Sequence, residues 1–143
     1  MSASASDPGI ADEIHRLFVA LEVRIKEHEE RCLDALDLSR MEAKALYRLE
    51  PGETVALRVV AERGGVDPSN LSAPVERLER RGLVERRAAK HDRRVRAVAL
   101  TASGVRLRDR LVACLVDGYP AVASLDPGER EQLRNLLRSA LDL

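Results

Sequence analysis

The chain has 143 residues, a length that suits one domain able to bury a core without disulfides or a metal ion. Aromatic residues make up only 2% of it and charged residues 34%, so the core must be aliphatic and the surface is typical of solvated helices. The 24 basic and 24 acidic residues cancel to a formal net charge of zero, which by itself argues against nucleic-acid binding.

The charges are, however, unevenly placed along the chain. Residues 1–37 carry nine acidic and four basic side chains, net −5, whereas residues 76–96 carry nine basic and four acidic ones, net +5. Such a dense Arg segment is what a polyanion would meet. From charge alone, a merely solvated helix face explains the segment as well.

The N-terminal stretch is small and polar, without the basic and apolar regions of a signal peptide, so we expect residues 1–9 to be a frayed tail. No apolar run approaches the roughly 18–20 residues that span a bilayer, and we expect no membrane partner. Two cysteines, Cys32 and Cys114, are too few for a disulfide framework. They are typical of a reducing cytoplasm, so we expect a cytoplasmic protein with two buried structural cysteines.

Helical periodicity predicts the first two elements. Apolar residues at spacings of three and four run through residues 10–37 and predict one long amphipathic helix. This helix is too long for a chain of 143 residues to cover, which points to a partner. Ser39 and Glu42 form an S-x-x-E capping box that opens a second helix, and Pro51-Gly52 ends it.

A helix-turn-helix follows. A short helix over residues 54–63 stops at Gly64-Gly65, where a tight turn needs glycine. Asp67-Pro68 supplies the N-cap and first position of the next helix, which runs to Arg81 and ends at Gly82.

After Gly82 the pattern changes to that of a hairpin. Residues 83–87 and 94–100 are β-prone runs around a charged tip at 88–93. Two further helices are predicted, one capped by Thr101 and the last by Asp126-Pro127. The predicted order is therefore α-α-α-α-β-β-α-α, a mainly α fold with a small β-hairpin wing.

Residues 54–100 have the physical features of a DNA-binding unit. The small polar N-terminal half of the helix over 67–81 can enter a major groove about 12 Å wide. The amide of Asn70 matches adenine, although simple helix capping also explains Ser69 and Asn70. The basic residues of the hairpin can reach the DNA backbone or a minor groove: Arg86, Arg87, Lys90, Arg93 and Arg94.

Three motifs here resemble the MarR family of winged helix-turn-helix regulators. They are the stretch LSAPVERLERRGLVER at 71–86, the wing tip Asp92-Arg93-Arg94 and the exit LTASG at 100–104. The other helices agree in number and order, so the resemblance covers nearly the whole chain. It implies a winged helix-turn-helix fold and a homodimer, joined by its first and last helices, on a roughly palindromic double-stranded DNA operator.

The same resemblance implies roles for individual residues. Arg77 would contact the DNA backbone, and Arg93 and Arg94 the minor groove or its phosphates, with Asp92 holding one of them in place. The residues facing bases would be Ser69, Asn70, Ser72 and Ala73. Pro74 departs from the family pattern because it removes the amide hydrogen bond to the carbonyl of Asn70. Either the helix begins late, or its first turn is re-aimed.

Signals for a sensor or an active site are weak. Family members often respond to small aromatic acids, oxidants or metals, and a pocket between the first, second and fifth helices would be lined by His15, Phe18 and Tyr47. Core or rim positions explain these three residues as well. No nucleophile set, phosphate loop or metal-ligand spacing is present, so we expect no enzyme, metal or cofactor.

The predicted function is therefore a MarR-type transcriptional regulator, a repressor that a small ligand or other signal releases from DNA. The predicted organisation is a tail (1–9), an N-terminal dimerisation helix (10–37), a winged helix-turn-helix (38–100) and C-terminal dimerisation helices (101–143). Two alternatives stay open. One is a winged-helix module whose Arg stripe binds an acidic protein, and the other is a redox switch that uses Cys32 or Cys114 on the same fold.

Overall fold

The computed structural model of the chain describes residues 8–88 and 96–143. The chain divides into two compact units, one formed by residues 31–115 and the other by residues 1–30 with 116–143. The wing-tip positions 89–95 and most of the predicted tail lie outside the described residues. Among the helices of the described ranges, none combines the length and the apolar character needed to cross a membrane.

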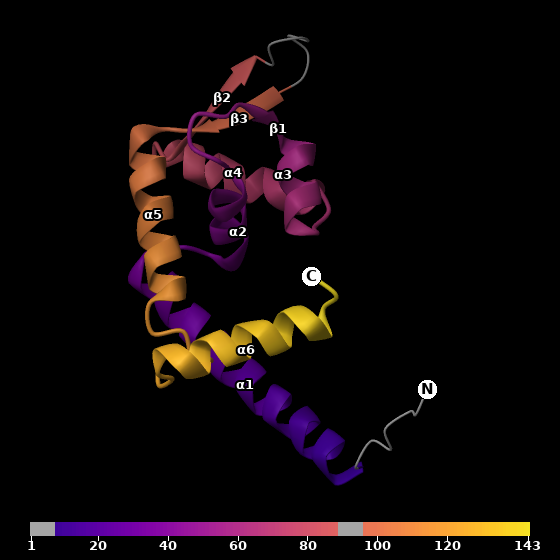
Figure 1. Ribbon diagram of the computed structural model, residues 1–143. Coiled ribbons are helices and arrows are strands. Elements are labelled where there is room, and N and C mark those ends of the chain that lie inside the picture. The colour runs from indigo at the N-terminus through magenta and orange to yellow at the C-terminus, as the bar shows by residue number, and fades with distance from the viewer. Residues whose placement is uncertain (1–7, 89–95) are drawn as a thin grey trace. The chain divides into compact units, whose positions relative to one another are not determined.

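Helices dominate the unit of residues 31–115, as predicted (Figure 1). It contains α2 (Arg40–Arg48), α3 (Leu57–Gly64) and α4 (Ser69–Arg80), which gather beside a small sheet. It also contains the C-terminal end of α1 (Pro8–Ala35) and nearly all of α5 (Ala102–Val116). The predicted fold class, mainly α with a β-hairpin wing, is confirmed.

The sheet has one more strand than the sequence predicts. Strands β2 (Val84–Ala88) and β3 (Arg96–Leu100) form the predicted antiparallel hairpin, with Val84 opposite Leu100. Strand β1 (Val55–Ala56) pairs with the other edge of β3, which corrects the prediction that a helix begins at residue 54. The observed order is α-α-β-α-α-β-β-α-α. The two residues expected to open the third helix form a strand instead, because their backbone groups hydrogen-bond to those of β3.

The core of this unit is aliphatic, as the composition requires. Its fully buried leucines come from three helices: Leu46 and Leu49 from α2 and the loop after it, Leu71 and Leu78 from α4, and Leu111 from α5. Each such side chain contributes about 1.5–3 kcal/mol relative to leaving it exposed. α4 is therefore anchored along one whole side.

The segment that leaves the wing, Thr101 to Gly104, packs against Gly82 and Leu83, which follow α4 directly. The Thr101 hydroxyl caps α5 by accepting from the Gly104 amide at 3.1 Å, and it donates to the Gly82 carbonyl at 2.6 Å. A Cβ at Gly104 would lie only 1.8 Å from the Leu83 carbonyl oxygen. The glycine of the exit motif is therefore a packing requirement.

α4 begins slightly later than predicted and passes through Pro74. It starts at Ser69, while the side chain of Asp67 accepts from the Ser69 amide at 2.8 Å and so caps the helix from outside it. Pro74 is buried inside the helix, which leaves the Asn70 carbonyl without its usual amide donor. Asn70 is exposed, so water can satisfy that carbonyl.

In the other unit, α6 (Pro127–Ala140) begins as predicted, with Asp126 and Glu129 forming a capping box and Pro127 in the first turn. Tyr119 meets the ring of His28 edge-on, with the ring centroids 6.4 Å apart. Large apolar side chains of both long helices are exposed in the single chain, each by at least 39%: Ile10, Ile14, Leu17, Phe18, Val19 and Val23 on α1, and Leu136 and Leu137 on α6.

The cysteines differ from their prediction. Cys32 and Cys114 form a disulfide, with their Cα atoms 5.8 Å apart, rather than remaining two separate structural thiols. Cys32 is buried, as expected, but Cys114 is only partly buried. The two residues are 82 positions apart, so their pairing depends on how α1 and α5 pack and not on any local spacing.

Candidate nucleic-acid interface

The residues of α4 divide by helical periodicity into a buried and an exposed side. The buried side consists of Leu71, Pro74, Val75 and Leu78. All five recognition-helix residues singled out from the sequence are exposed, and we call them the exposed face of α4: Ser69, Asn70, Ser72, Ala73 and Arg77. The core thus holds the helix by one side and leaves a side of small polar groups open.

Arg77 on this face is held by a buried carboxylate. Its Nε donates to Glu42 Oε1 at 3.0 Å, and the Glu42 side chain is only 7% exposed, against 44% for Arg77. Glu42 also accepts from the Ser39 amide at 2.7 Å, which completes the predicted capping box of α2. The ion pair therefore fixes one edge of the guanidinium and leaves much of the Arg77 side chain at the surface.

The pKa of Glu42 is lowered by this arrangement. Burial acts to raise the pKa, but the hydrogen bonds from Ser39 and the charge and hydrogen bond of Arg77 outweigh it. Glu42 is therefore held in its ionised form, and it pairs with Arg77, a partly exposed cation of α4. Its role was not predicted beyond the capping box, because the partner Arg77 lies 35 positions away.

A groove of about 610 Å³ lies beside this ion pair. It runs between the end of α1, the start of α2 and the C-terminal half of α4, and three arginines line it: Arg77, Arg80 and Arg81. Arg81 is fastened there because its Nη1 donates to the Asp37 carbonyl at 2.6 Å. Three acidic residues, Asp34, Asp37 and Glu42, line the same groove, so its charge is mixed rather than purely positive.

Arg86 on β2 joins the wing to α4. Its Nε lies 3.1 Å from Glu79 Oε2 and its Nη2 lies 3.6 Å from Glu76 Oε1, and its side chain is 25% exposed. Glu76 and Arg80 stand one turn apart on α4, the spacing of a helical ion pair, but the ion pair of Glu76 crosses to Arg86 on the wing instead. The contact of Arg86 with DNA stays a prediction. Its ion pairs with Glu76 and Glu79 also give it a structural role, which the sequence did not indicate.

The remaining wing residues are placed only in part. Arg87 is exposed and pairs with Glu85 on the same strand. The paired part of the hairpin ends where Ala88 lies opposite Arg96. The predicted tip residues Lys90, Asp92, Arg93 and Arg94 lie outside the described residues, and their roles stay predictions.

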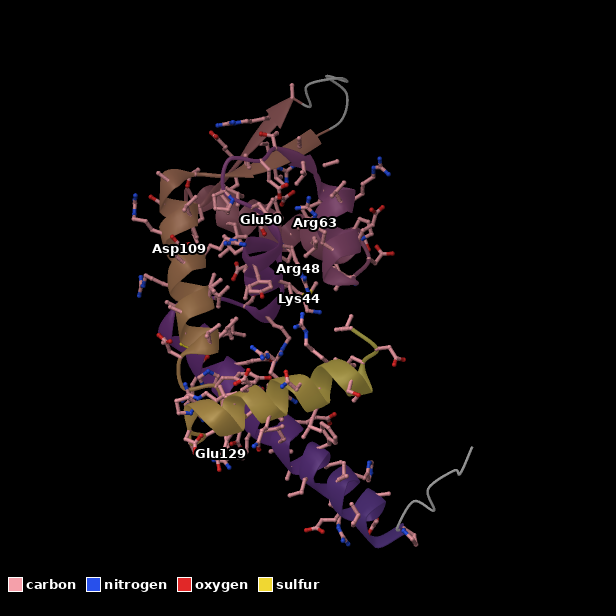
Figure 2. The ribbon with its side chains drawn as sticks, in the orientation of Figure 1. Lys44, Arg48, Glu50, Arg63, Asp109 and Glu129 are labelled. Atoms are coloured by element: carbon pink, nitrogen blue, oxygen red, sulfur yellow. A yellow bond between two sulfur atoms is a disulfide. The ribbon has the colours of Figure 1, made fainter. Side chains whose placement is uncertain are left out.

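The predicted ligand-site residues fall in different units. His15 and Phe18 are exposed on α1 in the unit of residues 1–30 and 116–143, and their predicted role is untested. Tyr47 lines a cavity of about 320 Å³ in the other unit, together with four charged residues: Arg48, Glu50, Arg63 and Arg108. Figure 2 shows Arg48, Glu50 and Arg63 close to one another beside α2 and α3.

Ion pairs build the walls of this cavity. Arg108 Nη2 donates to Glu50 Oε1 at 3.0 Å, and Arg63 pairs with Glu53 and donates to the Arg48 carbonyl at 3.1 Å. The Arg63 hydrogen bond is the main cause that lowers the pKa of Glu53. Over residues 8–88 and 96–143, no group of three or more His, Cys, Asp and Glu side chains could hold a metal ion.

Known proteins similar to this chain point to one family. Residues 36–95 match the family model described as MarR family. The organic hydroperoxide resistance transcriptional regulator of Bacillus subtilis (strain 168) is 28% identical over 111 residues, which cover 77% of this chain and 74% of that protein. The resemblance carried by the sequence motifs is confirmed.

Two solved structures illustrate the likeness in fold. The YusO protein from Bacillus subtilis superposes with a TM-score of 0.79 at 21% identity, covering 96% of this chain and 98% of that one. CouR from Rhodococcus jostii RHA1, bound to p-coumaroyl-CoA, gives a TM-score of 0.69 at 29% identity, covering 97% and 95%. The winged-helix architecture predicted from the sequence is confirmed.

Proposed function

Since residues 36–95 match the MarR family model, we propose that this chain is a MarR-type, homodimeric, sequence-specific transcriptional regulator that represses by occupying a roughly palindromic operator. The observation that carries the proposal is the exposed face of α4. A helix anchored by Leu71, Val75 and Leu78 presents small polar side chains and one fixed arginine to the outside. This is the arrangement that a recognition helix needs in a major groove.

Each residue of this face has a proposed task. The Asn70 amide donates to and accepts from an adenine edge, and Ser69 and Ser72 bind a base edge or a phosphate. Ala73 keeps the surface low enough for close approach. Arg77, held by Glu42, binds a backbone phosphate and so sets the register of the helix.

The wing supplies a second set of contacts. Arg87 is exposed on β2 and is suited to a phosphate. Arg86 would bind a phosphate as well. Its ion pairs with Glu79 and Glu76 also hold β2 against α4. Lys90, Arg93 and Arg94 extend the contact to the minor groove, with Asp92 holding one of the arginines.

Two copies of the chain would form the working unit. The exposed apolar side chains of α1 and α6, among them Leu17, Phe18 and Leu136, support this, because a single soluble chain rarely leaves so many uncovered. Two recognition helices would then enter successive major grooves about 34–36 Å apart. Dimerisation through helices near both ends of the chain leaves the segment 38–100 available to DNA.

A signal would release the operator by stabilising a dimer geometry that no longer fits it. The relative CouR is bound to p-coumaroyl-CoA, which supports a small-molecule effector. Tyr47 in its charged cavity is one candidate residue for it, and His15 and Phe18 on α1 are separate candidates. In this role the protein acts in the cytoplasm, where its DNA is, and needs no catalytic chemistry.

The test begins by selecting duplexes from a random library with the full-length protein. Binding to the selected duplex should be tight and should weaken steeply as salt rises. Asn70→Ala should change the preferred sequence at one position of each half-site, whereas Asn135→Ala, on α6, should change nothing. Replacing Arg93 and Arg94 by Ala should weaken binding to all duplexes and flatten the salt dependence while leaving the dimer intact.

The opposite results would count against the proposal. No enrichment of any sequence, together with weak binding that salt hardly changes, would favour the winged-helix module for an acidic protein partner. A uniform loss of affinity for every duplex on replacing Asn70 would remove the base contact. Unchanged affinity after replacing Arg93 and Arg94 would remove the wing.

A further inference from the structure

A cavity of about 490 Å³ lies between the end of α4 and the first half of α5, and we call it the arginine cavity. Its exposed lining consists of three arginines and a serine: Arg81, Arg106, Arg110 and Ser103. Its buried lining consists of three leucines, each at most 9% exposed: Leu36, Leu83 and Leu107. Among the residues that the structure describes, no acidic side chain lines this cavity, unlike the groove beside Glu42.

Two chain segments bring the arginines together. Ser103, Arg106 and Arg110 are spaced three and four residues apart on α5, so they share one face of that helix. Arg81 comes from the C-terminus of α4. The Thr101 amide donates to the Leu83 carbonyl at 3.1 Å and so joins the backbones of the two segments. The three guanidinium groups therefore meet at a fixed junction.

Two of the arginines are held by neutral acceptors. Arg81 Nη1 donates to the Asp37 carbonyl at 2.6 Å, and Arg106 Nη2 donates to the Ser103 hydroxyl at 2.9 Å. Within residues 8–88 and 96–143, no carboxylate pairs with either of them or with Arg110. These side chains are thus oriented without being neutralised.

Other arginines of this unit are neutralised. Arg77, Arg86 and Arg108 each pair with a glutamate. The chain has as many acidic as basic residues, so a shortage of carboxylates does not explain the difference. Asp109, labelled on α5 in Figure 2, precedes Arg110 directly but does not line the arginine cavity. The positive charge there is therefore a local property of this junction.

The lining of the cavity specifies the chemistry of a ligand. Like charges that share a site repel one another, and the first turn of α5 adds the partial positive charge of a helix N-terminus. A phosphate group relieves this repulsion best, because guanidinium groups bind its oxygens in pairs and a phosphate monoester carries nearly two negative charges at pH 7. The leucines offer an apolar surface to the organic part of such a ligand.

We propose that the arginine cavity binds an organic phosphate monoester, with its phosphate on Arg81, Arg106 and Arg110 and its organic group on the leucines. The cavity shares no lining residue with the one at Tyr47, so this is a separate ligand site. The bound dianion lowers the positive potential next to α4. It therefore also weakens DNA binding, a consequence that rests on the proposed function.

The experiment titrates the full-length protein, without DNA and in phosphate-free buffer, with phenyl phosphate in a calorimeter. Phenyl phosphate should bind in a saturable way, and benzoate, which has the same ring but a single charge, should bind roughly tenfold more weakly. Arg110→Gln should weaken phenyl phosphate binding roughly tenfold, whereas Arg58→Gln, at an exposed position of α3, should bind it like the wild type. Thermal unfolding checks that each variant folds, and Arg106→Gln is the second variant of the cavity.

The other outcomes are equally informative. Absence of saturable phenyl phosphate binding overturns the ligand site, and so does binding that Arg110→Gln and Arg106→Gln leave unchanged. Benzoate binding as tight as that of phenyl phosphate overturns the preference for a dianion. If phenyl phosphate does not bind but Arg110→Gln weakens duplex binding and flattens its salt dependence, the arginines serve the DNA backbone and the ligand site is refuted. A protein that binds phenyl phosphate but no duplex would refute the proposed function alone.

Discussion

The Nε of Arg77 on α4 lies 3.0 Å from Oε1 of Glu42 on α2, and Glu42 is at the same time the second half of the capping box at Ser39. One buried carboxylate thereby satisfies the first turn of α2 and orients an arginine of the exposed face of α4. A hydrogen bond to a charged group contributes about 1.5–3 kcal/mol, and here the carboxylate is buried whereas the 44% exposed Arg77 can be solvated when its partner is lost. Stability and DNA binding should therefore depend on the same side chain.

Replacing Glu42 by Gln tests this dependence. Gln can still complete the capping box, so the loss should be confined to the ion pair and should lower the free energy of unfolding by about 1–3 kcal/mol. The affinity for the selected duplex should fall as well, since Arg77 loses its fixed direction. Urea unfolding and DNA titration measure the two effects, with Glu62→Gln on the surface of α3 as the matched control. A variant that loses stability but keeps full affinity would separate Arg77 from DNA binding.

The same carboxylate predicts a pH dependence. The pKa of Glu42 is lower in the folded chain than its ordinary value of 4.5, so its contribution is fully present above pH 4.5 and is lost as pH falls through the folded pKa. The difference in unfolding free energy between the wild type and Glu42→Gln should be constant near neutrality and shrink below pH 4.5. Denaturant titrations at several pH values check it. A difference that grows on acidification would show that the folded pKa is raised.

Gly104→Ala should be among the most damaging single-methyl changes in the chain. The new Cβ would lie 1.8 Å from the Leu83 carbonyl oxygen, a backbone atom that cannot move aside cheaply. We expect a loss of about 3 kcal/mol or more in unfolding free energy. Gly64→Ala on α3 is the matched control, since its nearest neighbour would be 3.6 Å away, and it should leave stability unchanged or raise it by up to about 1 kcal/mol. Equal effects of the two changes would contradict the packing argument.

Phe18→Glu should dissociate the proposed dimer. Phe18 is 51% exposed in the single chain, so the change should hardly affect a monomer, whereas a charge placed in a dimer interface weakens it by about 2 kcal/mol or more. Sedimentation velocity over a range of concentrations measures the association. Arg16→Glu, at an exposed position of the same helix, introduces the same residue and should leave the dimer in place. A monomeric wild type, or a Phe18→Glu protein that still dimerises, would contradict the assignment.

Arg87→Ala should weaken binding to every duplex by a similar factor. Arg87 is exposed on β2 and pairs only with Glu85 among the described residues, so the stability of the fold should stay within about 0.5 kcal/mol of the wild type. The slope of log affinity against log salt should become shallower by about one. Arg58→Ala on the surface of α3 serves as the control. A change in preferred sequence, rather than in slope, would mean that Arg87 contacts bases.

Local chemistry explains why much of the fold could be predicted. The capping boxes at Ser39 and Asp126 and the turn at Gly82 are set by residues within a few positions of one another, and each is observed. The sides of α4 follow from helical periodicity in the same way, so its exposed residues could be named in advance. Pro74 did not stop the helix, because buried contacts hold it and the freed carbonyl of Asn70 is at the surface.

The features that could not be predicted all depend on long-range packing. Val55 pairs with Val98 across 43 positions of sequence, so nothing beside Val55 indicates a strand. Glu76 has Arg80 one turn away on its own helix, yet its ion-pair partner is Arg86 on the wing. The bond between Cys32 and Cys114 is the same case, since only the packing of α1 against α5 brings the sulfurs together.

The contact between Thr101 and Leu83 has a consequence for how such a protein can change. The Thr101 amide donates to the Leu83 carbonyl at 3.1 Å, so the chain returns after the hairpin to the point from which it left. The hairpin therefore starts and ends at two positions that this hydrogen bond holds together. Insertions, deletions and substitutions at its tip can alter reach and charge while α4 and α5 keep their places. The exposed face of α4 and the wing, the two parts of the proposed DNA-contacting surface, are therefore free to evolve at different rates.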